Sequence, residues 1–213
     1  MTSAFLIAFL LVALAELGDK SQLLLLGFAA RHRPGQVLAG AAIAIAALQL
    51  LAVVFGRTVG MLLPERLTAL IAGAVFVVFG LLTWLGRDGD GGDAAPRRFA
   101  VGPVLTVAAA FFLAEFGDKT QIMTVSIAAD PAAALRTLGW LAPHLRTPDP
   151  GTVATAAGVW LGSFAGMLLV DAVAIAFGAR MAERFAAAQV RRFSAIVFMV
   201  FGLLTLAAVF IGM

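Results

Sequence analysis

The sequence predicts an all-α integral membrane protein with six transmembrane helices, arranged as two inverted-topology repeats of three helices. Three observations support this fold class: the apolar composition, a series of long apolar runs, and a charged motif that occurs twice. The chain is 62% hydrophobic and only 13% charged, whereas soluble domains are about half apolar and about a quarter charged. A bilayer is therefore the expected environment of most of the chain.

The polar residues exclude several classes of protein. The chain has no cysteine, so disulfides, thiolate metal sites and thiol redox chemistry are excluded. The two histidines, His32 and His144, lie in polar connecting segments, so a histidine-rich metal site is not expected. The arginines lie in loops or at helix ends, where they indicate membrane orientation and not a nucleic-acid partner. No Walker motif is present, so we expect neither an ATPase nor another enzyme.

Six apolar runs are each long enough to cross a hydrocarbon core of about 30 Å as a helix. They cover residues 4–30, 36–57, 67–86, 100–129, 152–179 and 191–212. The first run is not expected to be a cleaved signal peptide, because it has no basic start and its final residues recur inside the chain. The fifth run carries glycines at every fourth position, which predicts close helix packing at Gly158, Gly162 and Gly166.

Two pairs of similar segments divide the chain into repeats. ELGDKSQ at residues 16–22 recurs as EFGDKTQ 99 residues later, and VFVVFGLLT recurs as VFMVFGLLT 122 residues later. The difference between the two offsets corresponds to an additional extracytoplasmic loop at about 130–151. We therefore expect a first repeat at 1–87, a Gly/Asp-rich cytoplasmic linker at 88–99, and a second repeat at 100–213.

Each predicted repeat has an odd number of spans, so the second enters the membrane from the side opposite to the first. Arginines are more frequent in loops 1, 3 and 5 than in loops 2 and 4, and basic loops face the cytoplasm. We therefore expect both termini to be extracytoplasmic. A multi-pass protein of the bacterial inner membrane is the expected localisation.

The repeated motif places charges near the middle of the first and fourth runs. Each ionisable residue at the centre of a bilayer costs about 2.5–3.5 kcal/mol on insertion scales. In a continuous helix, the two acids and the lysine of a motif would share one face. Gly18 and Gly117, inside the motifs, allow either close helix approach or a local break that frees backbone carbonyls. The charges expected within the membrane are Glu16, Asp19, Lys20, Glu115, Asp118, Lys119 and Asp171.

The free-energy cost of burying these charges is lower if they share one site at the membrane midplane. The predicted ligands all carry oxygen, which suits Ca²⁺, Mn²⁺ or Mg²⁺; they are Glu16, Asp19, Ser21, Gln22, Glu115, Asp118, Thr120 and Gln121. Four carboxylates against two lysines leave a net charge of −2, which one divalent cation or two protons would neutralise. The alternative is a structural cluster of ion pairs, although buried ion pairs stabilise proteins weakly.

Three further charged residues have less certain roles in the sequence. Lys20 and Lys119 are expected to pair with motif carboxylates, because a charged lysine is not a metal ligand. Asp171 lies inside the fifth run, and an intramembrane Asp is a candidate functional residue. It is interpreted as a proton carrier, as a partner of a lysine, or as a protonated and hydrogen-bonded structural group.

The doubled pattern E-x-G-D-(K/R)-(S/T) in a chain of this length resembles the Gdt-type family of cation/proton antiporters. Glu16, Gly18, Asp19, Lys20 and Ser21 match its first copy, and Glu115, Gly117, Asp118, Lys119 and Thr120 match its second. The resemblance covers essentially the whole chain. It implies exchange of Ca²⁺ or Mn²⁺ for protons, with the motif acids as the cation site, and a small bacterial member that exports manganese.

The resulting hypothesis is a secondary transporter that moves a divalent cation, Mn²⁺ before Ca²⁺, in exchange for protons. Its expected partners are the transported cation and the lipid bilayer, with no permanently bound cofactor and no nucleic acid. A homo-oligomer is possible but not indicated by the sequence. Two alternatives stay open at this stage. One is a passive divalent-cation channel, and the other is a membrane scaffold that transports nothing.

Overall fold

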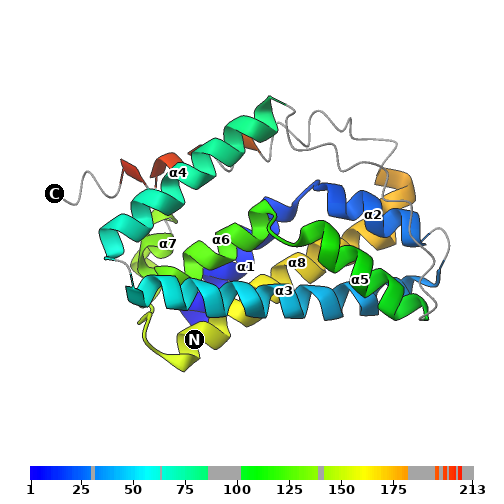
Figure 1. The fold of residues 1–213 in the computed structure, drawn as a ribbon, viewed down its shortest axis with the longest axis horizontal. Coiled ribbons are helices and arrows are strands. Elements are labelled where there is room, and N and C mark those ends of the chain that lie inside the picture. Colours follow the sequence, from blue (N-terminus) through cyan, green and yellow to red (C-terminus); the bar gives the residue numbers. More distant parts are fainter. Residues whose placement is uncertain are drawn as a thin grey trace.

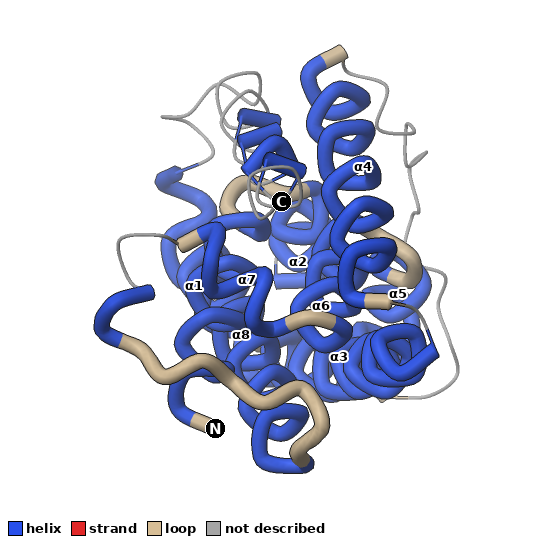
Figure 2. The backbone as a smooth tube through the Cα atoms, turned by 90° about the vertical axis from the view of Figure 1, so that its left-hand side faces the viewer, coloured by secondary structure: helices blue, strands red, loops and turns tan. Residues whose placement is uncertain are grey.

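The computed structural model describes residues 1–29, 32–62, 64–85, 102–138 and 142–181, together with short pieces at 195–196, 199–200, 202–204 and 206–207. Within these ranges the chain forms helices and loops and no strand, as Figure 2 shows. The all-α part of the predicted fold class is confirmed. The elements, in order, are α1 Thr2–Glu16, α2 Lys20–Ala29, α3 Pro34–Leu62, α4 Glu65–Trp84, α5 Pro103–Glu115, α6 Lys119–Ala129, α7 Pro131–Thr137, the 3₁₀ turn η1 Ala142–His144, and α8 Val153–Met181.

Three of the predicted runs form uninterrupted helices. The runs expected at 36–57, 67–86 and 152–179 correspond to α3, α4 and α8, with boundaries that differ by a few residues. Prolines fix the start of α3, α5 and α7 because the ring sets a helical φ where no N–H partner is needed. The linker expected at 88–99 lies outside the described residues. Of the run expected at 191–212, only the short pieces are described, and they are helical.

The two motif-bearing runs are not single helices, and the prediction that each motif occupies one helical face is wrong. The run at 4–30 is divided into α1 and α2, and the run at 100–129 into α5 and α6. At each break a glycine has a positive φ, 75° at Gly18 and 80° at Gly117, a conformation that glycine adopts without steric cost. Of the two readings of these glycines, the local break is the correct one. Figure 1 shows both bends near the middle of the bundle.

Long helices of one half of the chain pack on broken helices of the other. A Cβ on Gly162 of α8 would collide with the carbonyl oxygen of Phe5 in α1. A Cβ on Gly40 of α3 would lie 2.6 Å from the carbonyl oxygen of Val104 in α5. Phe5 and Val104 are separated by the first offset of the repeats, and Gly40 and Gly162 by the second. The same contact therefore occurs twice, each time between the two halves.

Helix α8 also crosses α3 in the middle of the bundle. Its Trp160 donates a hydrogen bond from Nε1 to the carbonyl oxygen of Ala46, at 3.0 Å. The three glycines of the fifth run were predicted to allow close helix packing, and they do: Gly158, Gly162 and Gly166 all face the backbone of α1. This prediction is confirmed, and the missing side chains at these three positions explain how α1 and α8 approach so closely.

The outer surface of the bundle is strongly apolar. Helix α3 exposes large hydrophobic side chains, among them Phe55 at 62% and Val54 at 58%. Among the described residues, two helices are long and apolar enough to cross a membrane: Pro34–Leu62 and Val153–Ala176, with mean hydropathies of 2.5 and 1.9. Exposed apolar surface of this kind, on helices of sufficient length, is typical of a protein surrounded by lipid.

The additional segment predicted at about 130–151 contains a short helix and a 3₁₀ turn. Asp130 directly precedes α7 and caps it, because its Oδ1 accepts a hydrogen bond from the N–H of Ala133 at 2.8 Å. Arg136 in its last turn lies 3.7 Å from Oδ2 of the same carboxylate. The turn η1 follows, and Arg57 of α3 donates a hydrogen bond to the carbonyl oxygen of Gly151 at the end of the segment.

Candidate cation site

The two helix breaks bring acidic residues of both motifs together. Glu16 is the last residue of α1 and Glu115 the last residue of α5, while Asp19 lies in the first break. One carboxylate oxygen from each of these three residues lies within 4.8 Å of the other two. Glu16 and Glu115 are 0% and 2% exposed. Residues 99 positions apart therefore form one buried acidic cluster, which we call the motif cluster.

The chain turns sharply at each break, and this turn aims the acids inward. The N–H of Asp19 donates to the carbonyl oxygen of Glu16 at 3.2 Å, and the N–H of Asp118 donates to that of Glu115 at 3.1 Å. The positive φ of the intervening glycine bends the chain before the next helix begins (Figure 1). Both acids of a motif therefore lie at one break, although they are not on one helical face.

Two hydroxyl groups hold Glu16, one from each motif. Ser21 Oγ donates a hydrogen bond to Oε1 at 2.6 Å, and Thr120 Oγ1 donates to Oε2 at 2.8 Å. Hydrogen bonds to an ionised acceptor are among the stronger ones in proteins. The bond from Thr120 joins the second motif to the first and fixes the orientation of the Glu16 carboxylate.

An ion pair also joins the two motifs. Lys119, the first residue of α6, places Nζ 3.2 Å from Oδ1 of Asp19, and both side chains are less than a tenth exposed. The ammonium group also interacts electrostatically with Glu16 and Asp118. The expectation that Lys119 pairs with a motif carboxylate is confirmed. The side chain of Lys20 lies outside what the structure describes.

The glutamines of the motifs form hydrogen bonds with backbone groups at the two helix breaks. Gln22 Nε2 donates to the carbonyl oxygen of Glu16 at 2.7 Å. Gln121 Oε1 accepts from the N–H of Gly117 at 2.6 Å, and its Nε2 donates to the carbonyl oxygen of Leu48 in α3 at 3.4 Å. Each amide thus satisfies backbone groups that a helix break leaves without an intrahelical partner. The ligand role predicted for these two residues remains a prediction.

A buried carboxylate of α8 lies beside the cluster. Asp171 of α8 is 0% exposed and interacts electrostatically with Glu16 and Asp19. Its two oxygens accept no hydrogen bond from any residue that the structure describes. The role of Asp171 stays a prediction, with a proton carrier, a partner of a lysine and a protonated structural group as its three readings.

Gln49 of α3 was not among the site residues predicted from the sequence. It is buried, and its Nε2 donates to Met167 Sδ of α8 at 3.5 Å. Gln49 and Asp171 are separated by the second repeat offset, so the two long helices carry polar residues at matching positions. An uncharged amide in the middle of a long apolar run was the available signal.

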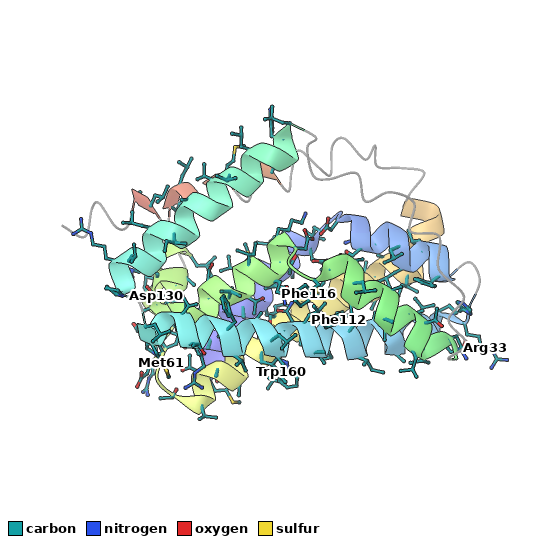
Figure 3. All side chains as sticks on the ribbon, viewed as in Figure 1. Arg33, Met61, Phe112, Phe116, Asp130 and Trp160 are labelled. Carbon is teal, nitrogen blue, oxygen red and sulfur yellow. The ribbon has the colours of Figure 1, made fainter. Side chains whose placement is uncertain are left out.

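The site lies midway along the bundle. Figure 3 shows Phe116, in the break between α5 and α6, between Arg33 at one end of the bundle and Met61 at the other. Both ends of α3 project well beyond the break, and its 29 residues extend over about 44 Å at the usual helical rise. A bilayer around α3 would therefore place the motif cluster well inside the hydrocarbon layer.

The cluster has the dimensions of a cation site. Ca²⁺ binds oxygen ligands at about 2.3–2.6 Å, so ligands on opposite sides of the ion are separated by roughly 4.6–5.2 Å. Carboxylate oxygens that lie within 4.8 Å of one another can therefore surround a single divalent ion. Carboxylates and hydroxyls are the donors that such hard cations prefer.

Comparison with known proteins agrees with this chemistry. The sequence pattern of the family described as "Divalent cation/proton antiporter GDT1" matches residues 4–90. A Vibrio cholerae protein whose name proposes manganese export is 30% identical over 95% of this chain and 90% of its own length. Protein PAM71 of Arabidopsis thaliana chloroplasts is 30% identical over 77% of this chain and 51% of its own length.

Part of the chain also resembles a eukaryotic protein. The Saccharomyces cerevisiae divalent cation/proton antiporter GDT1 is 38% identical over 36% of this chain and 28% of its own length. No solved structure is significantly similar. The similarity to the Vibrio protein extends over nearly the full length of both chains and therefore includes both motifs. The chain belongs to the GDT1 family, which consists of cation transporters and not of enzymes.

Proposed function

We propose that the protein moves a divalent cation across a membrane in exchange for protons, with Mn²⁺ as the first candidate and Ca²⁺ as the second. The observation that carries the proposal is the convergence of Glu16, Asp19 and Glu115 from two separate motifs. Family membership supports divalent-cation transport. The charge of the site supports exchange for protons.

The acids of the two motifs can hold either cargo, but not both together. Four motif carboxylates against two lysines leave a formal charge of −2, which a divalent ion or two protons would neutralise. Metal binding requires the carboxylates to be deprotonated, so protons and metal compete for the same oxygens. Alternate loading of one site from opposite sides of a membrane is sufficient for antiport.

Asp171 and the hydroxyl groups have supporting roles in this proposal. Asp171 lies in the field of Glu16 and Asp19, where it would carry a proton or complete the ligand shell. Ser21 and Thr120 hold the Glu16 carboxylate from two sides. With metal present, their oxygens would serve as neutral ligands or keep Glu16 in the orientation that binding needs.

The proposed topology is six spans in two inverted repeats, 1–87 and 100–213, with both termini extracytoplasmic in a bacterial inner membrane. Its support is the pair of equivalent contacts between Phe5 and Gly162 and between Val104 and Gly40. In each contact, the long helix of one half holds the motif-bearing helix of the other. Rocking of the halves about the motif cluster would open it to one side and then to the other.

The test is uptake of Mn²⁺ and Ca²⁺ into proteoliposomes under an imposed pH gradient. We expect uphill uptake that stops when the gradient is dissipated and that is lost in Glu16→Gln and Glu115→Gln. Arg136→Gln, which removes the half-exposed arginine that pairs with Asp130, is the matched control and is expected to transport normally.

Other results would support other functions. Flux that follows the cation gradient and ignores the pH gradient would indicate a channel. No flux of either ion through folded wild-type protein would indicate a scaffold, and the motif cluster would then be structural.

A further inference from the structure

The ion pair between Lys119 and Asp19 is unusual because it uses a carboxylate of the proposed cation site. Nζ of Lys119 lies 3.2 Å from Oδ1 of Asp19. Asp19 is also one of the three acids whose oxygens lie within 4.8 Å of one another. A positively charged side chain from the second motif therefore contacts the same group that a bound cation would use in the first motif.

Lys119 is close to acids of both motifs besides Asp19. Its ammonium group interacts electrostatically with Glu16 and Asp118 as well as with Asp19. Its side chain is only 7% exposed, so water does little to screen these interactions. Buried carboxylates without a nearby positive charge are costly, and Lys119 supplies that charge to the described cluster.

We propose that Lys119 is a tethered cation that neutralises the Asp19 side of the site until a divalent ion displaces it, and that thereby discriminates against monovalent ions. This inference rests on the function proposed above. A divalent ion at the cluster would repel the ammonium group and compete with it for Asp19. Lys119 has a flexible four-carbon stem, so its ammonium group can withdraw while the helix stays in place.

Selectivity follows from the charge of the competing ions. Coulomb attraction to the same carboxylates is twice as large for a divalent ion as for a monovalent one at the same distance. Na⁺ or K⁺ would carry the same single charge as the ammonium group that it must displace, and that group is already held in place. The Coulomb attraction of a divalent ion to the carboxylates is large enough to displace the lysine. Competition from the lysine lowers the affinity of the site for the divalent ion to a level that allows release.

The test is Mn²⁺ binding to purified, detergent-solubilised protein by isothermal titration calorimetry at fixed pH. We expect Lys119→Gln to bind Mn²⁺ about tenfold more tightly than wild type, which corresponds to about 1.4 kcal/mol. We also expect NaCl to weaken Mn²⁺ binding by Lys119→Gln more than choline chloride at equal ionic strength does. For wild type and the control Arg136→Gln, NaCl and choline chloride should weaken Mn²⁺ binding equally.

A double-mutant cycle connects the effect to Asp19. In an Asp19→Asn background, the further change Lys119→Gln should produce much less than the tenfold gain. Unchanged or weaker Mn²⁺ binding by folded Lys119→Gln would overturn the inference, and so would an undiminished gain in the Asp19→Asn background.

A second substitution covers the case in which Lys119→Gln does not fold. Lys119→Arg keeps the charge and can hold Asp19 through two parallel hydrogen bonds, so it should bind Mn²⁺ several-fold more weakly than wild type. Equal or tighter binding by Lys119→Arg would overturn the inference. If wild type binds Mn²⁺ and only the Lys119 predictions fail, the proposed function stands, whereas absence of Mn²⁺ and Ca²⁺ binding by wild type would overturn both.

Discussion

Replacing Gly117 by alanine tests whether the helix break in the second motif is real. A Cβ added at Gly117 meets no atom within 4 Å, so the substitution creates no clash. The backbone there has φ +80°, and an L-residue in the left-handed region costs about 1–2 kcal/mol. We therefore expect Gly117→Ala to lower the free energy of unfolding by about 1–2 kcal/mol through backbone strain alone.

Gly27 is a matched control for this substitution. It lies inside α2, and a Cβ there also meets nothing within 4 Å. In a helix interior, alanine is more stable than glycine by about 0.5–1 kcal/mol. Gly27→Ala and Gly117→Ala should therefore change stability in opposite directions, although both add one methyl group to open space.

The assay is unfolding of each purified variant in mixed micelles by a denaturing detergent, followed by tryptophan fluorescence. Mn²⁺ uptake is measured in parallel, and Gly117→Ala should reduce it because the turn at the break positions Asp118 and Lys119. Gly27→Ala should transport like wild type. If Gly117→Ala is neutral or stabilising, the fourth run is a continuous helix and the geometry of the motif cluster is incorrect.

Three further predictions follow from individual contacts. Thr120→Val removes the hydrogen bond to Glu16 and should weaken Mn²⁺ binding about tenfold. Thr120→Ser keeps the hydroxyl group and should bind Mn²⁺ normally. Equal Mn²⁺ binding by both variants would contradict the geometry of this hydrogen bond. Gly162→Ala forces a methyl group onto the backbone of Phe5 and should lower stability by about 1–3 kcal/mol in the same unfolding assay, unless α1 and α8 are not in contact. Trp160→Phe loses the hydrogen bond to α3 and should cost about 1 kcal/mol, and no loss of stability would indicate that this bond does not form.

Much of this arrangement could be predicted from the sequence because apolar runs and doubled motifs have few physical solutions. Three uninterrupted runs became α3, α4 and α8 within a few residues. Unpaired charges are costly in an apolar chain, and the motif occurs in both repeats, so a shared site that includes Glu16 and Glu115 could be expected from the sequence.

The remaining features depend on packing that a single sequence does not reveal. One glycine in an apolar run is compatible with a straight helix or with a break, and the neighbouring helices decide between them. The partner of Lys119 could have been any motif acid, and the structure selects Asp19 across the two halves. Gln49 was undervalued because an amide carries no charge, although it is as buried as the motif acids.

The central claim is that two motifs build one cation site, and the stoichiometry of Mn²⁺ binding tests it most directly. Purified wild-type protein is titrated with Mn²⁺ by calorimetry, with Glu16→Gln and Glu115→Gln measured alongside. We predict one Mn²⁺ per chain in wild type, and loss of that single site in either variant, because acids from both motifs lie within 4.8 Å of each other. Two Mn²⁺ per chain in wild type, with each variant retaining one, would show that the motifs bind separately and would contradict the account.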